Sequence, residues 1–537
     1  MSAPRSFPFE PDVPPAPLAA LLAPVRAAGL LAPPLPEGTD SPLIHRLADD
    51  SRAVAPGTLF VARSGDHTDG HLFLDTAVQN GAVAAIVSAD WHREHPTPVG
   101  SATARDAGPS PGRASTSPLG KGKRLPDAAC VLVPVTDTRA ALGEIANAFY
   151  GSPSLSLDLL GVTGTNGKTT TVFLLHRLLT ALGETAGLIG TVENRIGERT
   201  VETAYTTPEA IELNALLRAM VDAGCGACAM EVSSHGLALD RVRAQRFRAG
   251  VFTNLTQDHL DFHPSVEHYR ASKKRLFDGL DPDAVAVVNR DDAAWSEMVA
   301  DTAAPVVTYG TDPRSDVRVE VLENALGGLR LRLDGQERTA RLAGGFNAYN
   351  LAAAYAVGRA LGYDPGAVLD ALAEAPGVPG RFEAVRSPDG VLGVVDYAHT
   401  PDALENVLRT AREMMGEGGR LWAVFGCGGD RDRAKRPAMG RIAEALADCV
   451  VLTNDNPRTE DPQQILGAIR GGLRHPDAAS TIPDRAEAIA HAAREAASGD
   501  VVVVAGKGHE TYQIVGAERR PFDDRVALRA ALDRRAN

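Results

Sequence analysis

Short, almost uniformly apolar segments alternate along this chain with longer segments rich in alanine and leucine. Each short segment contains a near-continuous apolar run of four to six residues that predicts a β-strand, and the longer segments, such as 139–150, predict helices. Near-continuous apolar strands are typical of parallel sheets that helices cover on both faces, so we predict an α/β protein. The predicted strands lie at residues 58–62, 82–89, 130–135, 158–164, 250–255, 284–290, 391–398, 421–428, 449–455 and 500–508.

Two interruptions of this pattern divide the chain into three predicted domains. One precedes the strand at 158–164, and the other follows a helix that ends near Ala375, before a Pro-Gly pair. The prediction is a smaller N-terminal α/β domain (1–155), a central domain with a parallel, mononucleotide-binding sheet (156–377) and a Rossmann-like C-terminal domain (378–537).

Two stretches have a composition that does not favour a packed structure. Residues 1–40 are rich in proline and predict a loosely ordered tail that leads into a short helix. Residues 97–126 are rich in Gly, Pro, Ser and Thr with few large apolar side chains, so we predict a disordered surface loop. Its basic residues could form a binding patch, although a solvated insertion is favoured.

The composition excludes several classes of protein. The 537 residues carry a net charge of −13, which argues against a nucleic-acid binder, whose footprint is a basic face. No apolar stretch approaches the roughly 20 residues that a membrane span needs. Five cysteines do not make a disulfide framework, so we predict a reduced, cytoplasmic protein, and a monomer. The lone Cys225-x-x-Cys228 fits a zinc half-site or redox pair less well than buried packing, because no second pair has metal-ligand spacing.

A glycine-rich loop between a predicted strand and a predicted helix has the pattern of a phosphate-binding loop. It spans 161–171, and Val162 stands where the common pattern has its first glycine. Lys168 would reach the β- and γ-phosphates, and the Thr169 hydroxyl would bind Mg²⁺. The alternative, a turn that caps a helix, is less favoured in this context. ATP is the predicted ligand, with contacts from Thr163, Gly164, Thr165, Asn166, Gly167, Lys168 and Thr169.

The loop alone fits kinases, GTPases and motor ATPases, but the sequence around it is more specific. With Asn166 the loop reads GTNGKT, and eleven strings in order resemble the Mur ligase family of peptidoglycan-building amide ligases. The set is most similar to members that add the third residue of the stem peptide. The strings lie at 50–62, 206–209, 231–242, 254–263, 268–277, 344–354, 379–383, 396–405, 426–437, 455–460 and 505–510.

The resemblance implies ATP-dependent amide formation in peptidoglycan precursor synthesis. The expected substrates are ATP, UDP-N-acetylmuramoyl-L-alanyl-D-glutamate and diaminopimelate, which the enzyme joins through an acyl phosphate on the D-glutamate γ-carboxylate. It implies Mg²⁺ held by Thr169, Glu231, His259 and Lys273, the last carbamylated by CO₂. From the residues alone, His259 could be a core histidine, and Lys273 and Lys274 could be solvated.

The resemblance also implies the substrate contacts. The nucleotide end of ATP would meet Asn347, Arg381 and Asp396. The UDP-linked dipeptide would meet hydroxyl, carboxylate, imidazole and guanidinium groups, although Leu239 stands where some members have a polar contact. These groups belong to Ser51, Asp66, His67, Thr68, Thr206, Thr207, Ser233 and Arg241.

The string Asp455-Asn456-Pro457-Arg458 resembles that of members that add diaminopimelate, whereas lysine-adding members lack the arginine. Diaminopimelate carries a second carboxylate, which the planar Arg458 fork suits. Arg431, Gly506 and Glu510 would complete the pocket, with Glu510 facing the distal ammonium. Arg458 could instead pair at the surface with Glu460 or Asp461.

Other functions remain open from the sequence. Within the enzymes these are a lysine-adding ligase and, more remotely, folylpolyglutamate synthase; outside them, a regulatory nucleotide-binding protein or a P-loop motor. The sequence does not distinguish meso- from LL-diaminopimelate.

Overall fold

The computed structural model describes residues 11–32, 41–65, 68–95, 130–203, 205–325, 327–415 and 418–536. The predicted insertion at 97–126 and the candidate residues Asp66 and His67 lie outside these ranges. The chain forms two compact units. The first comprises residues 1–156, 208–223 and 238–245, and the second comprises 157–207, 224–237 and 246–537.

The first unit is built on a four-stranded parallel sheet in the order β3-β4-β5-β6. Leu59 and Val61 pack on one face of the sheet with α1, α4 and α6, and Phe60 and Ala62 pack on the other face beside α2. This burial on both faces explains why its strands are continuously apolar. The elements are β3 (Arg46–Ala48), β4 (Thr58–Val61), β5 (Ala82–Ser88), β6 (Val131–Val135), α1 (Leu18–Ala27), α2 (Leu74–Gln79), α3 (Ala89–Glu94), α4 (Thr138–Phe149) and α6 (Ala210–Asp222), and β1 (Ala16–Pro17) pairs with β2 (Leu43–Ile44).

Helix α1 is a short helix inside the stretch 1–40, which was predicted as a loosely ordered tail leading into such a helix, and it is packed rather than loose. Leu18, Leu21, Leu22 and Val25 are each at most 3% exposed and belong to the core of the first unit. These positions repeat at helical spacing, and burying each side chain contributes about 1.5–3 kcal/mol. The flanking prolines therefore bound a packed helix.

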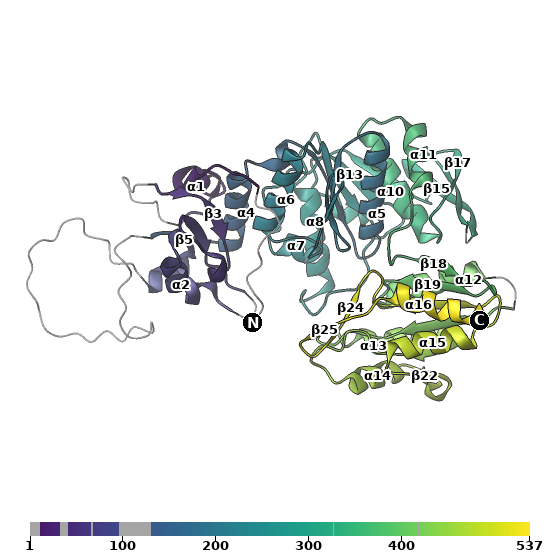
Figure 1. The fold of residues 1–537 in the computed structure, drawn as a ribbon. Coiled ribbons are helices and arrows are strands. Elements are labelled where there is room, and N and C mark those ends of the chain that lie inside the picture. The colour runs from purple at the N-terminus through teal and green to yellow at the C-terminus, as the bar shows by residue number, and fades with distance from the viewer. Residues whose placement is uncertain are drawn as a thin grey trace, which may run out of the picture. The chain divides into compact units, whose positions relative to one another are not determined.

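The second unit contains an eleven-stranded sheet in the order β10-β9-β8-β11-β7-β12-β13-β14-β15-β16-β17 (Figure 1). The strands from β8 to β15 in this order run parallel, as predicted, but an antiparallel extension closes each end of the sheet. The strands are β7 (Asp158–Thr163), β8 (Ala186–Ile189), β9 (Asn194–Ile196), β10 (Arg199–Val201), β11 (Ala227–Glu231), β12 (Ala249–Phe252), β13 (Val285–Asn289), β14 (Val306–Gly310), β15 (Val317–Ala325), β16 (Gly328–Leu333) and β17 (Gln336–Ala340).

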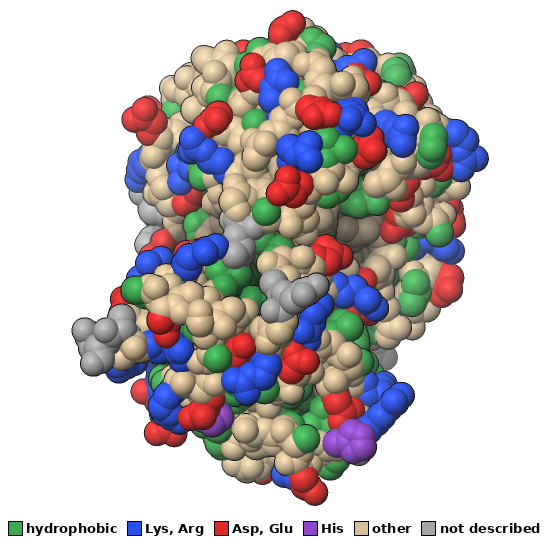
Figure 2. Space-filling view, turned by 90° about the vertical axis from the view of Figure 1, so that its right-hand side faces the viewer, with side chains coloured by type: hydrophobic (Ala, Val, Ile, Leu, Met, Phe, Trp, Pro, Cys, Tyr) green, Lys and Arg blue, Asp and Glu red, His purple; other side chains and the backbone are tan. Residues whose placement is uncertain are grey.

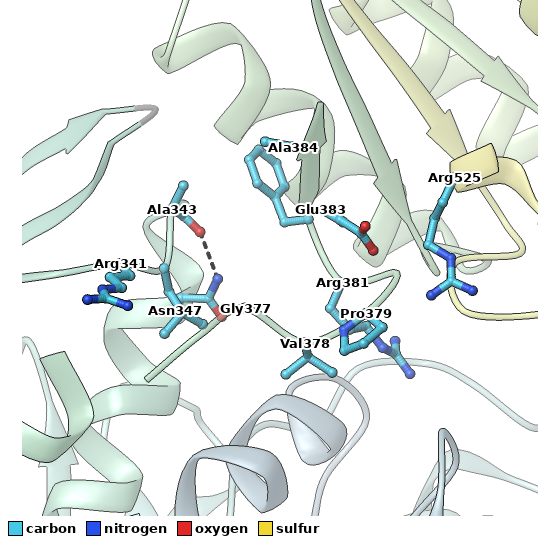
Figure 3. Close-up of a pocket in the computed structure, with 12 residues that line it drawn as sticks. Arg341, Ala343, Asn347, Gly377, Val378, Pro379, Arg381, Glu383, Ala384 and Arg525 are labelled. Atoms are coloured by element: carbon cyan, nitrogen blue, oxygen red, sulfur yellow. Dashed lines mark hydrogen bonds between the residues drawn. The ribbon is translucent and has the colours of Figure 1, made fainter. Parts of the chain in front are cut away.

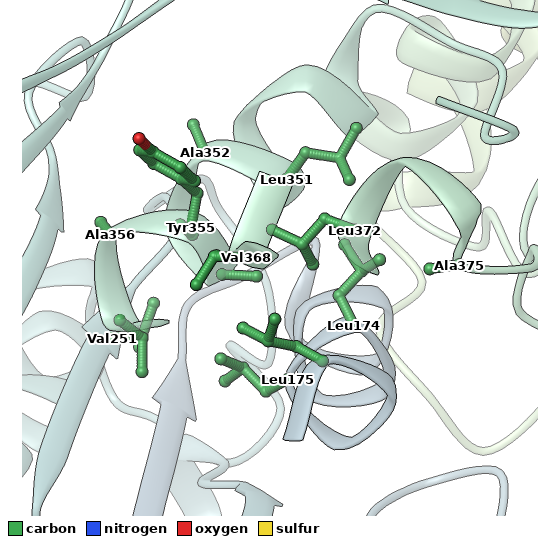
Figure 4. Close-up of a cluster of buried hydrophobic side chains, with 14 of the residues drawn as sticks. Leu174, Leu175, Val251, Leu351, Ala352, Tyr355, Ala356, Val368, Leu372 and Ala375 are labelled. Atoms are coloured by element: carbon green, nitrogen blue, oxygen red, sulfur yellow. The ribbon is translucent and has the colours of Figure 1, made fainter. Parts of the chain in front are cut away.

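The core beside this sheet fixes the helix that follows the phosphate loop. Leu174 and Leu175 of α5 pack against Leu351 of α10 and Leu372 of α11, and each is at most 2% exposed (Figure 4). Because this cluster is fully buried, the beginning of α5 is held firmly at the end of β7. The helices are α5 (Lys168–Ala181), α7 (Ser234–Ala238), α8 (Val266–Asp278), α9 (Trp295–Met298), α10 (Phe346–Ala360) and α11 (Pro365–Glu374).

The second unit also contains a six-stranded sheet in the order β18-β19-β23-β20-β21-β22, parallel except for β18. Separate apolar clusters line its two faces, as in a doubly wound fold. Its strands are β18 (Glu383–Arg386), β19 (Leu392–Asp396), β20 (Leu421–Phe425), β21 (Cys449–Leu452), β22 (Ser480–Thr481) and β23 (Val501–Ala505), with the hairpin β24 (Tyr512–Val515) and β25 (Glu518–Pro521). Its helices are α12 (Pro401–Glu413), α13 (Lys435–Leu446), α14 (Pro462–Arg470), α15 (Arg485–Glu495) and α16 (Asp524–Asp533).

The predictions made from composition about cysteines, membrane spans and charge can be compared with the described part of the structure. Cys225 and Cys228 are buried free thiols, and the described ranges hold no group of three or more His, Cys, Asp or Glu side chains able to bind a metal. No helix in the described part of the chain is long and apolar enough to cross a membrane. On the face in Figure 2, acidic and basic side chains are interspersed and do not gather by sign.

Candidate functional site

The phosphate loop joins the end of β7 to the beginning of α5 through two glycines with left-handed backbone. Gly164 has φ +147° and Gly167 has φ +86°. A Cβ at Gly164 would lie 1.9 Å from Thr253 Oγ1, and one at Gly167 would lie 2.6 Å from Asn350 Oδ1, so neither position admits a side chain. Val162 is a buried residue inside β7, which explains why its departure from the common pattern leaves the loop intact.

Two lysines from distant parts of the chain converge on one carbonyl of this loop. Lys168 Nζ donates to Gly164 O at 2.9 Å, and Lys273 Nζ, from α8, donates to the same oxygen at 2.7 Å. Lys273 is 1% exposed, and its ammonium lies over the Tyr269 ring at 4.4 Å. Burial and the neighbouring Lys168 lower the pKa of Lys273 well below its usual value.

Lys274 points away from this group although it is adjacent in sequence. Its Nζ pairs with Asp278 and, at 2.6 Å, with Asp301. Burial lowers its pKa, but the hydrogen bonds to these carboxylates outweigh burial and raise it. The helical rotation between neighbouring positions therefore separates the two lysines into a buried amine and a surface ion pair.

Glu231 ends β11, the strand beside β7, and its carboxylate lies next to the loop threonine. The carboxylate accepts from Thr169 Oγ1 at 3.1 Å, from Thr191 N at 2.8 Å and from Thr191 Oγ1 at 3.1 Å, and Glu231 is 1% exposed. A hydroxyl and a carboxylate side by side are oxygen ligands of the kind that Mg²⁺ prefers. These two residues fit the proposed metal.

His259 lies near these side chains, but no hydrogen bond joins its ring to Thr169 or Glu231. Its backbone has φ +55°, its Nε2 lies 3.4 Å from Asp258 Oδ2, and its ring meets His235 edge-on at 4.8 Å. Burial lowers its pKa to about 3, against the opposing effect of Asp258. The imidazole is therefore neutral at pH 7, which is the metal-binding form.

A cavity of about 360 Å³ lies beside the segment that joins the two sheets of the second unit (Figure 3). Asn347 lines it and is held by its bond to Ala343 O at 2.7 Å and by Asn350 at 2.9 Å. Arg381 also lines it, donates to Thr169 Oγ1 at 3.0 Å and lies over the Tyr397 ring at 4.4 Å. The Arg381 guanidinium therefore lies between the cavity and the phosphate loop.

Asp396 was expected to accept hydrogen bonds from the ribose hydroxyls, but its carboxylate already accepts hydrogen bonds from backbone N–H groups. One oxygen accepts from Phe382 N and the other from Ala398 N, both at 2.7 Å. Burial raises the pKa of Asp396. Asp396 therefore braces the segment that carries Arg381, and each oxygen retains only its remaining lone-pair position for a ligand.

The amino-acid candidates gather where β20, β21 and β23 end, at the carboxyl edge of the six-stranded sheet. Asn456 Nδ2 donates to Glu510 Oε2 at 2.9 Å. Gly506 has φ +120°, and a Cβ there would lie 2.6 Å from Asp455 Oδ2. Pro457 is buried against Gly429, where a Cβ would lie 1.9 Å from Pro457 O.

Arg458 is held by the backbone rather than by a surface ion pair. It has φ +52°, its N donates to Ile514 O at 3.1 Å, and its Nη1 donates to Gly429 O at 2.8 Å. The alternative partner Glu460 instead pairs with Arg436 at 2.9 Å, and Asp461 accepts from the backbone of α14. Arg431, by contrast, is exposed.

The candidates for the UDP-linked substrate divide between the two units. In the second unit, Thr207 Oγ1 lies 3.0 Å from Ser233 Oγ, and Thr206 Oγ1 lies 3.0 Å from Thr191 Oγ1. In the first unit, Ser51 is buried, Thr68 is exposed, and Arg241 pairs with Glu209 at 2.7 Å.

Sequence reasoning missed three residues that contact these groups. Thr191 binds both oxygens of Glu231, Asp402 accepts from Asn166 Nδ2 at 2.6 Å, and Lys507 donates to Glu510 at 2.8 Å. Asp402 and Lys507 lie inside strings that carried the resemblance, which was a usable signal. Thr191 lies outside those strings.

Family models match most of the chain. The Mur ligase family catalytic domain matches 43–150, the Mur ligase middle domain matches 162–358, and the Mur ligase glutamate ligase domain matches 380–508. The predicted three-domain α/β architecture is therefore confirmed.

Relatives and solved structures agree with these matches. The UDP-N-acetylmuramoyl-L-alanyl-D-glutamate–2,6-diaminopimelate ligase of Cytophaga hutchinsonii is 43% identical over 90% of this chain and 93% of its own. A solved ligase of the same name is 31% identical, with a TM-score of 0.63 over 98% of this chain and 100% of its own. Folylpolyglutamate synthase of Mycobacterium tuberculosis, at 22% identity and TM-score 0.55 over 69% of this chain and 93% of its own, shares only the fold. The chain belongs to the Mur ligase family.

Proposed function

We propose that the protein is the ATP-dependent ligase that joins diaminopimelate to the D-glutamate γ-carboxylate of UDP-N-acetylmuramoyl-L-alanyl-D-glutamate. The observation that carries the ligase assignment is the pair of lysines, Lys168 and Lys273, on Gly164 O. A general P-loop protein has no need of a second, buried amine at this carbonyl. The names of the relatives reported above give these compounds as their substrates, which supports the same choice here.

In the proposed reaction, the γ-carboxylate attacks the γ-phosphate of ATP and forms an acyl phosphate and ADP. An amine of diaminopimelate then attacks the acyl carbon, phosphate leaves, and the amine loses a proton. Lys168 and Arg381 supply positive charge where two anions must meet. Asn347 orients the nucleotide base in the cavity beside Arg381.

Magnesium would be held by Thr169 and Glu231, with His259 as a further ligand, and would supply charge neutralisation to the phosphate oxygens. Lys273 fits a role as a carbamate because its lowered pKa favours the neutral amine, which is the form that adds CO₂ and loses a proton. The carbamate would replace a cation by an oxygen ligand. The described residues form no group of three or more His, Cys, Asp or Glu side chains able to hold a metal, so the carbamate would add an oxygen ligand to those of Thr169 and Glu231.

For the amino acid, Arg458 would pair with the distal carboxylate of diaminopimelate, which lysine lacks. Its guanidinium is positioned by a hydrogen bond to Gly429 O, which leaves its other N–H donors for a ligand. The lysine-adding alternative is disfavoured for this reason. We also propose a cytoplasmic, monomeric enzyme, because the substrates are soluble and all five thiols are free.

The test is the mass of the product formed from ATP, Mg²⁺, the UDP-linked dipeptide and each candidate amino acid. Diaminopimelate should give the tripeptide, and phosphate release should require both the dipeptide and the amino acid. Phosphate release without them would instead indicate a motor or transport ATPase. Nucleotide binding without any product would indicate a regulatory protein.

A further inference from the structure

A buried lysine that the proposed reaction does not use lies beneath the amino-acid candidates. Lys507 follows β23, and its side chain is 0% exposed. Its Nζ donates to Glu510 Oε2 at 2.8 Å and to Asn456 Oδ1 at 3.0 Å, and lies 3.6 Å from Asp455 Oδ1. A fully buried ammonium with three such partners is held in a single orientation.

Lys507 restricts Glu510 to one usable oxygen. Glu510 Oε2 accepts from both Lys507 and Asn456, whereas no hydrogen bond from the described residues reaches Oε1. The Glu510 side chain is 16% exposed, so the carboxylate is anchored through Oε2 without being fully buried. Asn456 is itself fixed, because its Oδ1 also accepts from Ile514 N at 2.9 Å.

The charges around Glu510 indicate which kind of ligand this part of the site would bind. Asp455 and Glu510 share one ammonium, Lys507, so this side of the site keeps one excess negative charge. The nearby buried pair Arg485–Asp524, at 2.7 Å, is neutral as a unit. Arg458 donates to a carbonyl, and the neighbouring carboxylate of Asp430 is engaged by Thr459 at 2.8 Å.

We propose that Lys507 is a positioning residue that sets the specificity of the amino-acid site. It orients Glu510 so that Oε1 accepts a hydrogen bond from the distal ammonium of the diamino acid. It also limits the excess negative charge in this part of the site to a single charge, which this ammonium balances. The inference rests on the proposed function. Arg458 reads the distal carboxylate, whereas Lys507, acting through Glu510, determines how the distal ammonium is read.

The experiment measures steady-state kinetics of Lys507→Met, which removes the charge and keeps an unbranched side chain. We expect KM for diaminopimelate to rise about tenfold to a hundredfold, with KM for ATP unchanged within about twofold and kcat less affected than KM. KM for lysine, where measurable, should rise by the same factor, because lysine shares the ammonium. Lys274→Met is the matched control: it also removes a lysine paired with two carboxylates, at the surface, and should leave KM for diaminopimelate unchanged.

A double-variant comparison separates positioning from simple loss of structure and remains informative where Lys507→Met alone does not fold. Once Glu510→Gln has removed the carboxylate, adding Lys507→Met should change KM for diaminopimelate by less than about twofold. A tenfold further rise in the double variant, or a fall in kcat with unchanged KM in Lys507→Met, would overturn the inference. Failure of the wild-type enzyme to use diaminopimelate at all would instead refute the proposed function.

Discussion

The phosphate loop and the amino-acid site differ in how the charges of their buried lysines are compensated. At the loop, Lys168 and Lys273 both donate to one neutral carbonyl, and burial lowers the pKa of each. At the amino-acid site, Lys507 lies between Glu510 and Asp455 and is already compensated. Under the proposed function, the first region receives negative charge as phosphate and as the carbamate formed when CO₂ adds to Lys273, and the second discriminates a ligand that carries both signs.

The sharpest test of the first region is Lys168→Ala. The amine supplies charge where the carboxylate meets the γ-phosphate, so we expect kcat to fall by about a thousandfold or more. Thermal unfolding should remain close to that of the wild type, because Lys168 is half-buried and not part of the apolar core. A near-normal ligase rate would show that the loop has been misassigned.

Lys273→Ala should reduce activity by about a hundredfold, because the proposed carbamate oxygen is lost from the metal site. Formate or acetate should restore part of the rate by supplying an oxygen ligand. Depleting CO₂ and bicarbonate from the wild-type assay should lower the rate reversibly. The control is Lys274→Ala, whose side chain lies in a surface ion pair; a transfer of the defect to this variant would contradict the carbamate.

Arg458→Ala tests the second region. A charge-assisted pair contributes about 1.5–3 kcal/mol, so kcat/KM for diaminopimelate should fall roughly tenfold to a hundredfold while that for lysine changes little. Comparing the meso and LL isomers in the wild type would show which stereochemistry the pocket accepts. Equal use of lysine and diaminopimelate by the wild type would refute a carboxylate-reading arginine.

The smallest expected effect concerns stability in acid near the amino-acid site. Hydrogen bonds from Arg436 lower the pKa of Glu460 from 4.5 to about 2. A lowered pKa in the folded state means that the pair stabilises the protein above pH 4.5 and that this contribution is lost as pH falls towards about 2. Melting temperatures recorded across that range should fall less steeply for Glu460→Gln than for the wild type.

The sequence was most informative where burial acts on consecutive residues. Strands such as β23, apolar throughout, could be predicted because both faces of the sheet are covered. The antiparallel edge was not predicted, because β15 alternates buried and exposed positions and lacks an apolar run. A short helix was predicted at the end of the proline-rich tail, but the burial of α1 through its regularly spaced leucines was not.

The candidate site could be predicted only as far as its motifs reached. Glu231 and Lys273 were named from the resemblance, and the structure places them beside the loop. The roles of Thr191 and Lys507 depend on contacts between residues brought together by folding. Thr191 reaches Glu231 from 40 positions away, and Lys507 reaches Asn456 from 51. No local pattern encodes these two long-range pairings, whereas the pairing of Lys507 with Glu510, three positions away, lies inside one of the strings.

The division of the chain into two units limits how the enzyme can be dissected. Helix α6 lies between strands of the central sheet in sequence, yet Ile211 and Ala215 complete the core formed by α1 and α4. A fragment that stops at residue 156 would leave that apolar surface in water and should aggregate. Recombinant pieces of this protein, or chimaeras with its relatives, should therefore be cut so that residues 208–223 stay with the N-terminal unit.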